Sequence, residues 1–200
     1  ALFAFIAGDA WKVLQPHQSH DVGEVNGEAL SAQDYQNLVE EYTEVVKFSR
    51  GTSALTDEEN NQIKDEVWRN YVNNKLIENE AKKLGISVSK AEIQAIIDAG
   101  VHPMLQQTPF RNPQTGAFDK DMLKKFLVDY SKMNTAQMPA QYAEYYQSMY
   151  KFWSFLEKQL IQNRLAEKYQ ALVSKSLFSN PVEAQVAFDA RVDLCIRDSP

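Results

Sequence analysis

Residues 139–175 read PAQYAEYYQSMYKFWSFLEKQLIQNRLAEKYQALVSK, a stretch with no glycine and with proline only at its first position. Proline suits the first turn of a helix, and no later residue interrupts the pattern, so the stretch predicts one continuous helix. At about 1.5 Å per residue this helix would be about 55 Å long, which is longer than a compact domain is wide. We therefore predict a mostly α-helical fold that contains one very long helix.

Apolar and aromatic side chains cover most of the surface of this helix between residues 142 and 156. A helix that is apolar nearly all round must be buried or must offer a surface to another molecule. All five methionines lie between residues 104 and 149, and flexible thioethers suit a surface that repacks around varied partners. Two interpretations stay open: packing in a core or dimer seam, and contact with other polypeptides. The candidate peptide-binding residues are Met104, Phe110, Tyr142, Tyr146, Met149, Phe152 and Trp153.

Capping patterns mark the starts of helices upstream of residue 139. In each, a hydroxyl side chain precedes a carboxylate by three residues, as in Ser31 with Asp34, Thr56 with Glu59, and Ser89 with Glu92. Gly85 and Gly100 predict the ends of the second and third of these helices.

A loop is predicted across residues 101–118, because three prolines and a glycine exclude regular structure there. Asp119 then caps a shorter helix that ends near Tyr130.

Two short segments near the ends of the chain alternate in the manner of strands. Residues 22–28 end in an Asn-Gly turn, and residues 186–192 alternate between apolar and other side chains. Because the two segments lie at opposite ends of a helical chain, we predict that they pair as a small two-stranded sheet.

The composition argues against several classes of function. The formal net charge is −6, so the chain has no basic field for nucleic acid. The histidines His17, His20 and His102 and the one cysteine, Cys195, do not have the spacing of a zinc site. There is no glycine-rich phosphate loop and no nucleophilic serine motif. We therefore expect no catalytic residues, no metal and no cofactor.

The first residues form a short apolar run at Leu2, Phe3, Phe5 and Ile6. A membrane-spanning helix needs about 20 apolar residues, so this run cannot span by itself. One interpretation is a short docking helix or the remnant of a signal peptide. The other is the outer end of a transmembrane anchor, with Trp11 at the membrane interface.

Three segments resemble one known family when their order is considered together. Residues 22–27 followed by Ser31, the run NKLIENEAKKLGISVS at residues 74–89, and residues 108–119 resemble the N-terminal chaperone region of SurA and PpiD proteins. The likeness extends from about residue 1 to residue 193. The PpiD-type members are the more similar, because they place a short apolar patch, a turn and a Phe-Asp helix start in the third segment.

This resemblance implies a domain organisation. Residues 1–14 would be the end of a membrane anchor, 15–21 a linker, and 22–193 a helical chaperone domain of the SurA N-terminal type. Residues 194–200 do not continue the family's strand pattern, and we interpret them as a tail added to the native chain.

The resemblance also implies a function and a location. The domain would bind unfolded secreted or outer-membrane polypeptides at the periplasmic face of the bacterial inner membrane, near the Sec translocon. The parvulin-type prolyl isomerase domains of such proteins are absent from this stretch, so we expect it to be non-catalytic. Two alternatives stay open: a structural or homodimerisation module, and a fragment with residual isomerase activity.

Overall fold

The computed structural model describes residues 21–134 and 137–177. Its fold is mostly α-helical with one very long helix, as predicted from the sequence. The elements, in chain order, are β1 (Asp21–Val25), β2 (Glu28–Ser31), α2 (Ala32–Arg50), α3 (Asp57–Lys83), α4 (Lys90–Ala99), the 3-10 helix η1 (Leu105–Gln107), α5 (Lys120–Lys132) and α6 (Ala140–Leu177).

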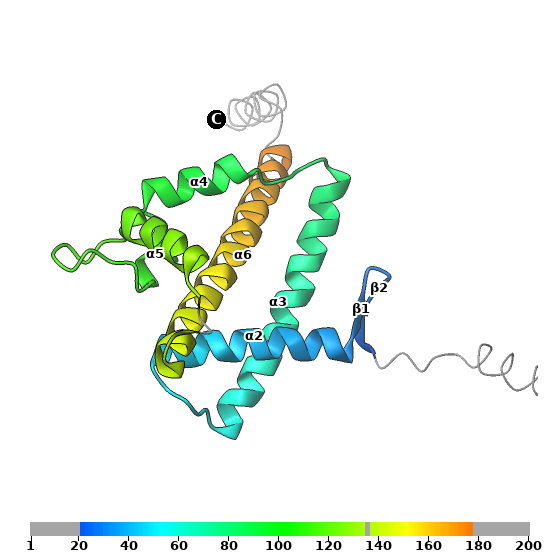
Figure 1. The fold of residues 1–200 in the computed structure, drawn as a ribbon. Coiled ribbons are helices and arrows are strands. Elements are labelled where there is room, and N and C mark those ends of the chain that lie inside the picture. Colours follow the sequence, from blue (N-terminus) through cyan, green and yellow to red (C-terminus); the bar gives the residue numbers. More distant parts are fainter. Residues whose placement is uncertain (1–20, 135–136, 178–200) are drawn as a thin grey trace, which may run out of the picture.

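α6 is the central element of the fold. α2 crosses both α3 and α6, and α3 also contacts α6, so these three helices form one group (Figure 1). α4, η1 and α5 lie on the other side of α6 from α3 (Figure 1). α6 therefore separates two packed regions and contributes to both.

The predicted helix starts are confirmed by their hydrogen bonds. Thr56 accepts a bond from the backbone N–H of Glu59 at 3.2 Å, and the Glu59 carboxylate accepts one from the Thr56 N–H at 2.8 Å. Ser89 and Glu92 form the same reciprocal pair at the start of α4. These local bonds satisfy backbone donors that the first turn of a helix leaves without partners, so the starts are set by short sequence patterns.

The strand near the N-terminus pairs with a neighbour that the sequence analysis missed. β1 and β2 form an antiparallel hairpin, with Val25 opposite Glu28. Asn26 and Gly27 have φ angles of 52° and 82°, the left-handed values that a two-residue hairpin turn needs. The second strand escaped notice because Ser31 ends it and also caps α2. The proposed partner strand at 186–192 lies outside the described residues, so that pairing stays a prediction.

The hairpin packs closely against α3. A side chain on Gly23 would collide with the indole ring of Trp68, so only glycine allows this approach. The Trp68 ring in turn lies edge-on to Tyr35 and stacks with Tyr71, at centroid distances of 6.3 and 6.1 Å. This aromatic row fixes the hairpin to the start of α2 and the middle of α3.

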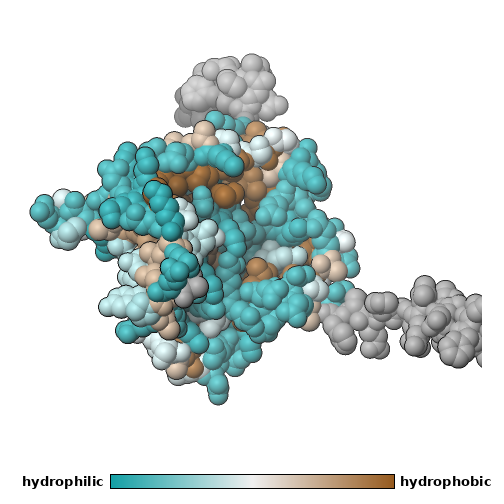
Figure 2. Space-filling view, viewed as in Figure 1, coloured by the Kyte–Doolittle hydropathy of each residue, from teal (hydrophilic) through white to brown (hydrophobic). Residues whose placement is uncertain are grey.

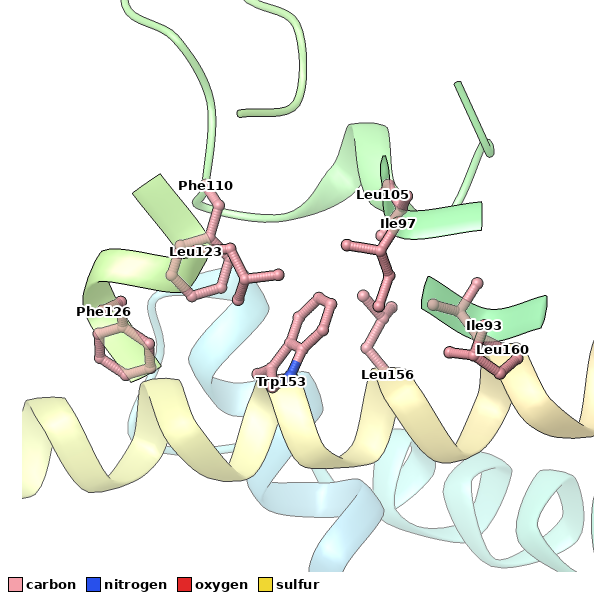
Figure 3. Packing of buried hydrophobic residues seen from close by; sticks show 9 residues of the cluster. All are labelled: Ile93, Ile97, Leu105, Phe110, Leu123, Phe126, Trp153, Leu156 and Leu160. Carbon is pink, nitrogen blue, oxygen red and sulfur yellow. The ribbon is translucent and has the colours of Figure 1, made fainter. Parts of the chain in front are cut away.

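The larger hydrophobic core lies between α6 and the segment 93–126. Trp153, Leu156 and Leu160 point from α6 toward α4, α5 and the loop between them (Figure 3). The loop supplies Leu105 and Phe110, which are 0% and 2% exposed. The prolines do prevent a long helix across 101–118, but the segment is ordered and fills the core.

A smaller core joins α2 to α3, and it contains the buried residues Val39, Ile63 and Val67. The opposite side of α6 packs onto this part of the molecule. The Phe152 ring lies 5.5 Å from Phe48, and the Phe155 ring lies 5.5 Å from Tyr42. Packing on two sides therefore explains much of the apolar surface of α6, while Tyr142, Tyr145 and Tyr150 remain exposed.

Glu92 ties the start of α4 to the far half of α6. Its carboxylate accepts hydrogen bonds from the Ser89 N–H at 3.0 Å and from Lys168 Nζ at 3.0 Å, and Arg164 Nε lies 3.5 Å away. The Lys168 ammonium also donates to the Ser87 carbonyl at 2.5 Å. The backbone bond from Ser89, and then the bond from Lys168, lower the pKa of Glu92 to about 2.

We predict that Glu92 contributes to stability in a pH-dependent way. Its pKa is about 2 when folded and 4.5 ordinarily, so its contribution is fully present above pH 4.5 and is lost as the pH falls toward 2. Thermal unfolding should show that Glu92→Gln has a lower Tm than the parent at pH 7. Between pH 4.5 and 2 the Tm of the variant should fall less steeply.

The matched control for this measurement is Glu144→Gln, because Glu144 is exposed on α6 and forms no salt bridge with a described residue. Its Tm should follow that of the parent at every pH. Parallel pH profiles for parent and Glu92→Gln would contradict the role given to Glu92.

Candidate functional site

The seven residues proposed from the sequence as a peptide-binding surface do not form one surface. Phe110, Phe152 and Trp153 are 2%, 7% and 3% exposed. Trp153 meets Phe110 edge-on in the larger core, and Phe152 packs on Phe48. These three side chains are buried, because the helices that cover them come from distant parts of the sequence, and a peptide-contacting role for them stays a prediction.

The other four candidates lie at or near the surface. Met104, Tyr146 and Met149 are half-buried and pack against the larger core, where the Tyr146 ring stacks on Phe126 at 6.3 Å. Tyr142 alone is well exposed, at 59%. A peptide-contacting role for these four stays a prediction. Met104, Tyr146 and Met149 pack against the cluster that contains Phe110 and Trp153, and Met104 also lines a small groove with Phe152.

A more coherent site is a groove enclosed by α2, α3 and α6, which we call the α2–α3–α6 groove. Figure 2 shows apolar surface between α3 and α6 just above α2, and a larger apolar area beneath α4. The groove has a volume of about 280 Å³. Its lining residues are Leu38, Glu41, Tyr42, Val67, Asn70, Tyr71, Asn74, Lys75, Glu78, Phe155, Lys158, Gln159 and Gln162.

The floor of the groove is apolar and aromatic. Tyr42, Tyr71 and Phe155 are half-buried, and Val67 is buried beneath them. The Tyr42 ring packs against Phe155 at 5.5 Å, which joins α2 to α6 at the base of the groove. Partly exposed aromatic rings of this kind offer apolar area that a ligand side chain can cover.

Four carboxamide side chains line the groove together with four charged ones, and we call this polar part of the lining the rim. Asn70 and Asn74 come from α3, and Gln159 and Gln162 come from α6. Asn74 Nδ2 donates to Gln162 Oε1 at 2.7 Å, a bond that links the two walls. A carboxamide carries donors and an acceptor, which match the C=O and N–H groups of a peptide backbone. The groove therefore combines an apolar floor with side chains suited to a polypeptide of any sequence.

The electrostatics of the floor keep Tyr42 neutral. Burial, and then the neighbouring Glu66 carboxylate, raise the pKa of Tyr42 to about 12, while the Arg50 charge acts in the opposite direction. On the rim, the hydrogen bond to the Glu28 carboxylate raises the pKa of Lys75, which stays protonated. Near neutral pH Tyr42 is therefore uncharged and Lys75 is positively charged.

Within the described residues, no cluster of histidine, cysteine, aspartate and glutamate has the geometry to hold a metal ion. Across the same ranges, no helix combines the length and the apolar character needed to cross a membrane.

Sequence reasoning missed the groove because its walls come from three separate helices. A local signal was present: Asn70 and Asn74 are four residues apart and so lie on one face of α3. That face could be recognised only with α6 beside it, since Gln159 and Gln162 are more than eighty positions away in sequence.

One family model, described as the SurA-like N-terminal domain, matches residues 1–127. The matched region covers the hairpin, α2, α3, α4, the loop and the first part of α5, and it ends before α6. It includes the α2 and α3 walls of the groove. No curated protein and no solved structure matches the chain.

Truncation of core and surface aromatic residues should have very different effects on stability. We expect Trp153→Ala to lower the free energy of unfolding by about 3–5 kcal/mol, because it leaves a cavity beside Phe110 and Leu156. Tyr142→Ala, at an exposed position, should change it by less than about 0.5 kcal/mol. Denaturant unfolding followed by circular dichroism measures both. A small change in the free energy of unfolding for Trp153→Ala would argue that Trp153 is not a core residue.

Proposed function

Because the chain belongs to the family of SurA-like N-terminal domains, we propose that it is a non-catalytic chaperone domain that holds unfolded polypeptide segments. The observation that carries the proposal is the α2–α3–α6 groove, with its apolar floor and carboxamide rim. Unfolded chains expose apolar side chains and unpaired backbone groups together, and this groove offers partners for both.

The size of the groove favours weak and transient holding. A volume of about 280 Å³ accommodates a short segment and not a folded surface. Apolar burial contributes about 25 cal/mol per Å² and is non-directional, so it does not require a particular client sequence. Hydrogen bonds from the rim would fix the backbone of the client without reading its side chains.

A second candidate function is self-association through the first turns of α6. Tyr142 and Tyr145 are 59% and 50% exposed there, which is unusual for two large aromatic residues close in sequence. A homodimer that covers them would make the domain a structural module. Light scattering at several protein concentrations separates this function from client holding.

We predict that Tyr71→Ser weakens client holding without unfolding the domain. Tyr71 is half-buried on the floor of the groove, so its loss removes aromatic surface that a client would cover. The measurement is the suppression of aggregation of an unfolded outer-membrane-type protein, at increasing ratios of domain to client. The variant should need several-fold more protein for equal suppression, since about 1 kcal/mol corresponds to a several-fold change in affinity.

Tyr169→Ser is the matched control, because Tyr169 is also a half-buried tyrosine but does not line the groove. Both variants must keep the circular dichroism spectrum of the parent. Equal suppression by the parent and a folded Tyr71→Ser variant would place the client site elsewhere. Equal weakening by both variants would show a general effect of lost stability.

We also propose that the whole protein is a PpiD-like folding factor, anchored in the inner membrane and facing the periplasm near the Sec translocon. The apolar run at Leu2, Phe3, Phe5 and Ile6 supports an anchor, and the family match includes this run. The run lies outside the described residues. Secreted and outer-membrane polypeptides would then be the clients.

The anchor proposal predicts the behaviour of the full-length protein on fractionation. The native protein should stay with membranes through alkaline extraction, because an inserted helix is not released by removal of charge. Removal of everything before residue 15 should release it into the soluble fraction. A native protein that is extracted as a peripheral protein would contradict the anchor.

A further inference from the structure

A second groove continues from the α2–α3–α6 groove toward the hairpin. The two grooves share Leu38, Glu41, Tyr71 and Lys75, so they form one continuous depression over α2 and α3. We call the second part the acidic groove. Its volume is about 750 Å³, and it extends to Glu28 on β2 and to Lys151 on α6.

Carboxylates outnumber ammonium groups along this continuous depression. The lysines are Lys75, Lys151 and Lys158, and the carboxylates are Glu28, Asp34, Glu40, Glu41, Glu44 and Glu78. Each lysine already has a carboxylate partner. Lys75 pairs with Glu28 at 2.5 Å, Lys151 with Glu44 at 2.6 Å, and Lys158 with Glu41 at 2.5 Å. Six carboxylates less three lysines leave three negative charges in excess.

The excess charges belong to Asp34, Glu40 and Glu78, which form no salt bridge with any described residue. Neutral groups donate to two of them: the Ser31 hydroxyl to Asp34 at 2.7 Å, and the Gln36 amide to Glu40 at 3.0 Å. A hydrogen bond from a neutral donor orients a carboxylate without cancelling its charge. The negative field along the groove is therefore available to a ligand.

Aromatic surface lies beside these charges. Tyr71 lines both parts of the depression, and Tyr42 also lines the α2–α3–α6 groove. A cation near a tyrosine ring and a carboxylate is favoured by both groups. Lysine and arginine also carry apolar stems that can cover an aromatic floor while the charged end reaches a carboxylate.

We propose that the continuous depression selects unfolded segments in which an apolar or aromatic residue lies close to lysine or arginine. The apolar residue occupies the α2–α3–α6 groove, and the cationic residues lie along the acidic groove. This inference rests on the proposed function and adds to it the charge of the preferred client. Segments of similar hydropathy that carry aspartate or glutamate are repelled by the same field.

The test uses three labelled peptides with identical apolar residues, in which the same flanking positions are all Lys, all Gln or all Glu. Binding is measured by fluorescence anisotropy on the whole chain. In buffer of about 0.02 M ionic strength, the Lys peptide should bind at least about 10-fold more tightly than the Glu peptide. In about 0.5 M salt the ratio should fall toward one, because screening removes the field.

Charge-reversal variants test whether the carboxylates of the depression cause the preference for the Lys peptide. Glu40→Lys with Glu78→Lys should abolish the preference for the Lys peptide, since both exposed residues line the depression. Glu24→Lys with Glu144→Lys is the control, because these exposed residues do not line it. Each double variant changes the formal net charge by four, from −6 to −2. The control should keep most of the preference. If the first variant misfolds, Glu40→Gln with Glu78→Gln replaces it. This variant should reduce the preference for the Lys peptide over the Glu peptide by half or more.

The outcomes separate this inference from the proposed function. Equal binding of the three peptides by the parent would overturn the charge preference and leave the chaperone proposal intact. If both double variants lose the preference equally, the preference comes from the overall charge of the protein, and the role given to the groove is overturned. If none of the three peptides binds, both the charge preference and the chaperone proposal are overturned.

Discussion

The packing of α6 on two sides is the constraint on which the rest of the structure depends. Trp153, Leu156 and Leu160 form one core with α4, α5 and the loop, while Phe152 and Phe155 meet aromatic residues of α2. Among the described residues, α4, α5 and the loop form their core with α6, whereas α2 and α3 also pack against each other through Val39, Ile63 and Val67. Removing the α6 surface would expose the larger core and the aromatic side of α2 at once, because a helix or short loop buries its apolar side only against a neighbour.

The α2–α3–α6 groove is a consequence of this arrangement. α2 crosses α3 and α6, and the groove of about 280 Å³ is lined by residues of all three helices. The walls are regular helices joined across the rim by Asn74 and Gln162, so the groove is held in shape by packing and not by a flexible loop. A preformed groove lowers the entropy lost on binding, which is consistent with the proposed holding of polypeptide segments.

α4, α5 and the loop between them pack against the side of α6 that faces away from the groove. The loop that resembles a family signature places Leu105 and Phe110 at the centre of the larger core, and Glu92 joins the start of α4 to Lys168. These contacts stabilise α6 from the side opposite the groove. Trp153 and Phe110, which the sequence offered as client contacts, therefore support the α6 wall of the groove from its other side, because close packing there holds the helix in position.

The sequence by itself determined the helices. The Thr56–Glu59 and Ser89–Glu92 caps, the Asn-Gly turn and the uninterrupted run of α6 all act over a few residues, so they can be recognised without knowledge of the fold. Only the tertiary structure decided which aromatic residues of α6 are buried and that Asn74 lies beside Gln162. These outcomes depend on contacts between distant segments, and periodicity shows that a helix face is apolar without showing what covers it.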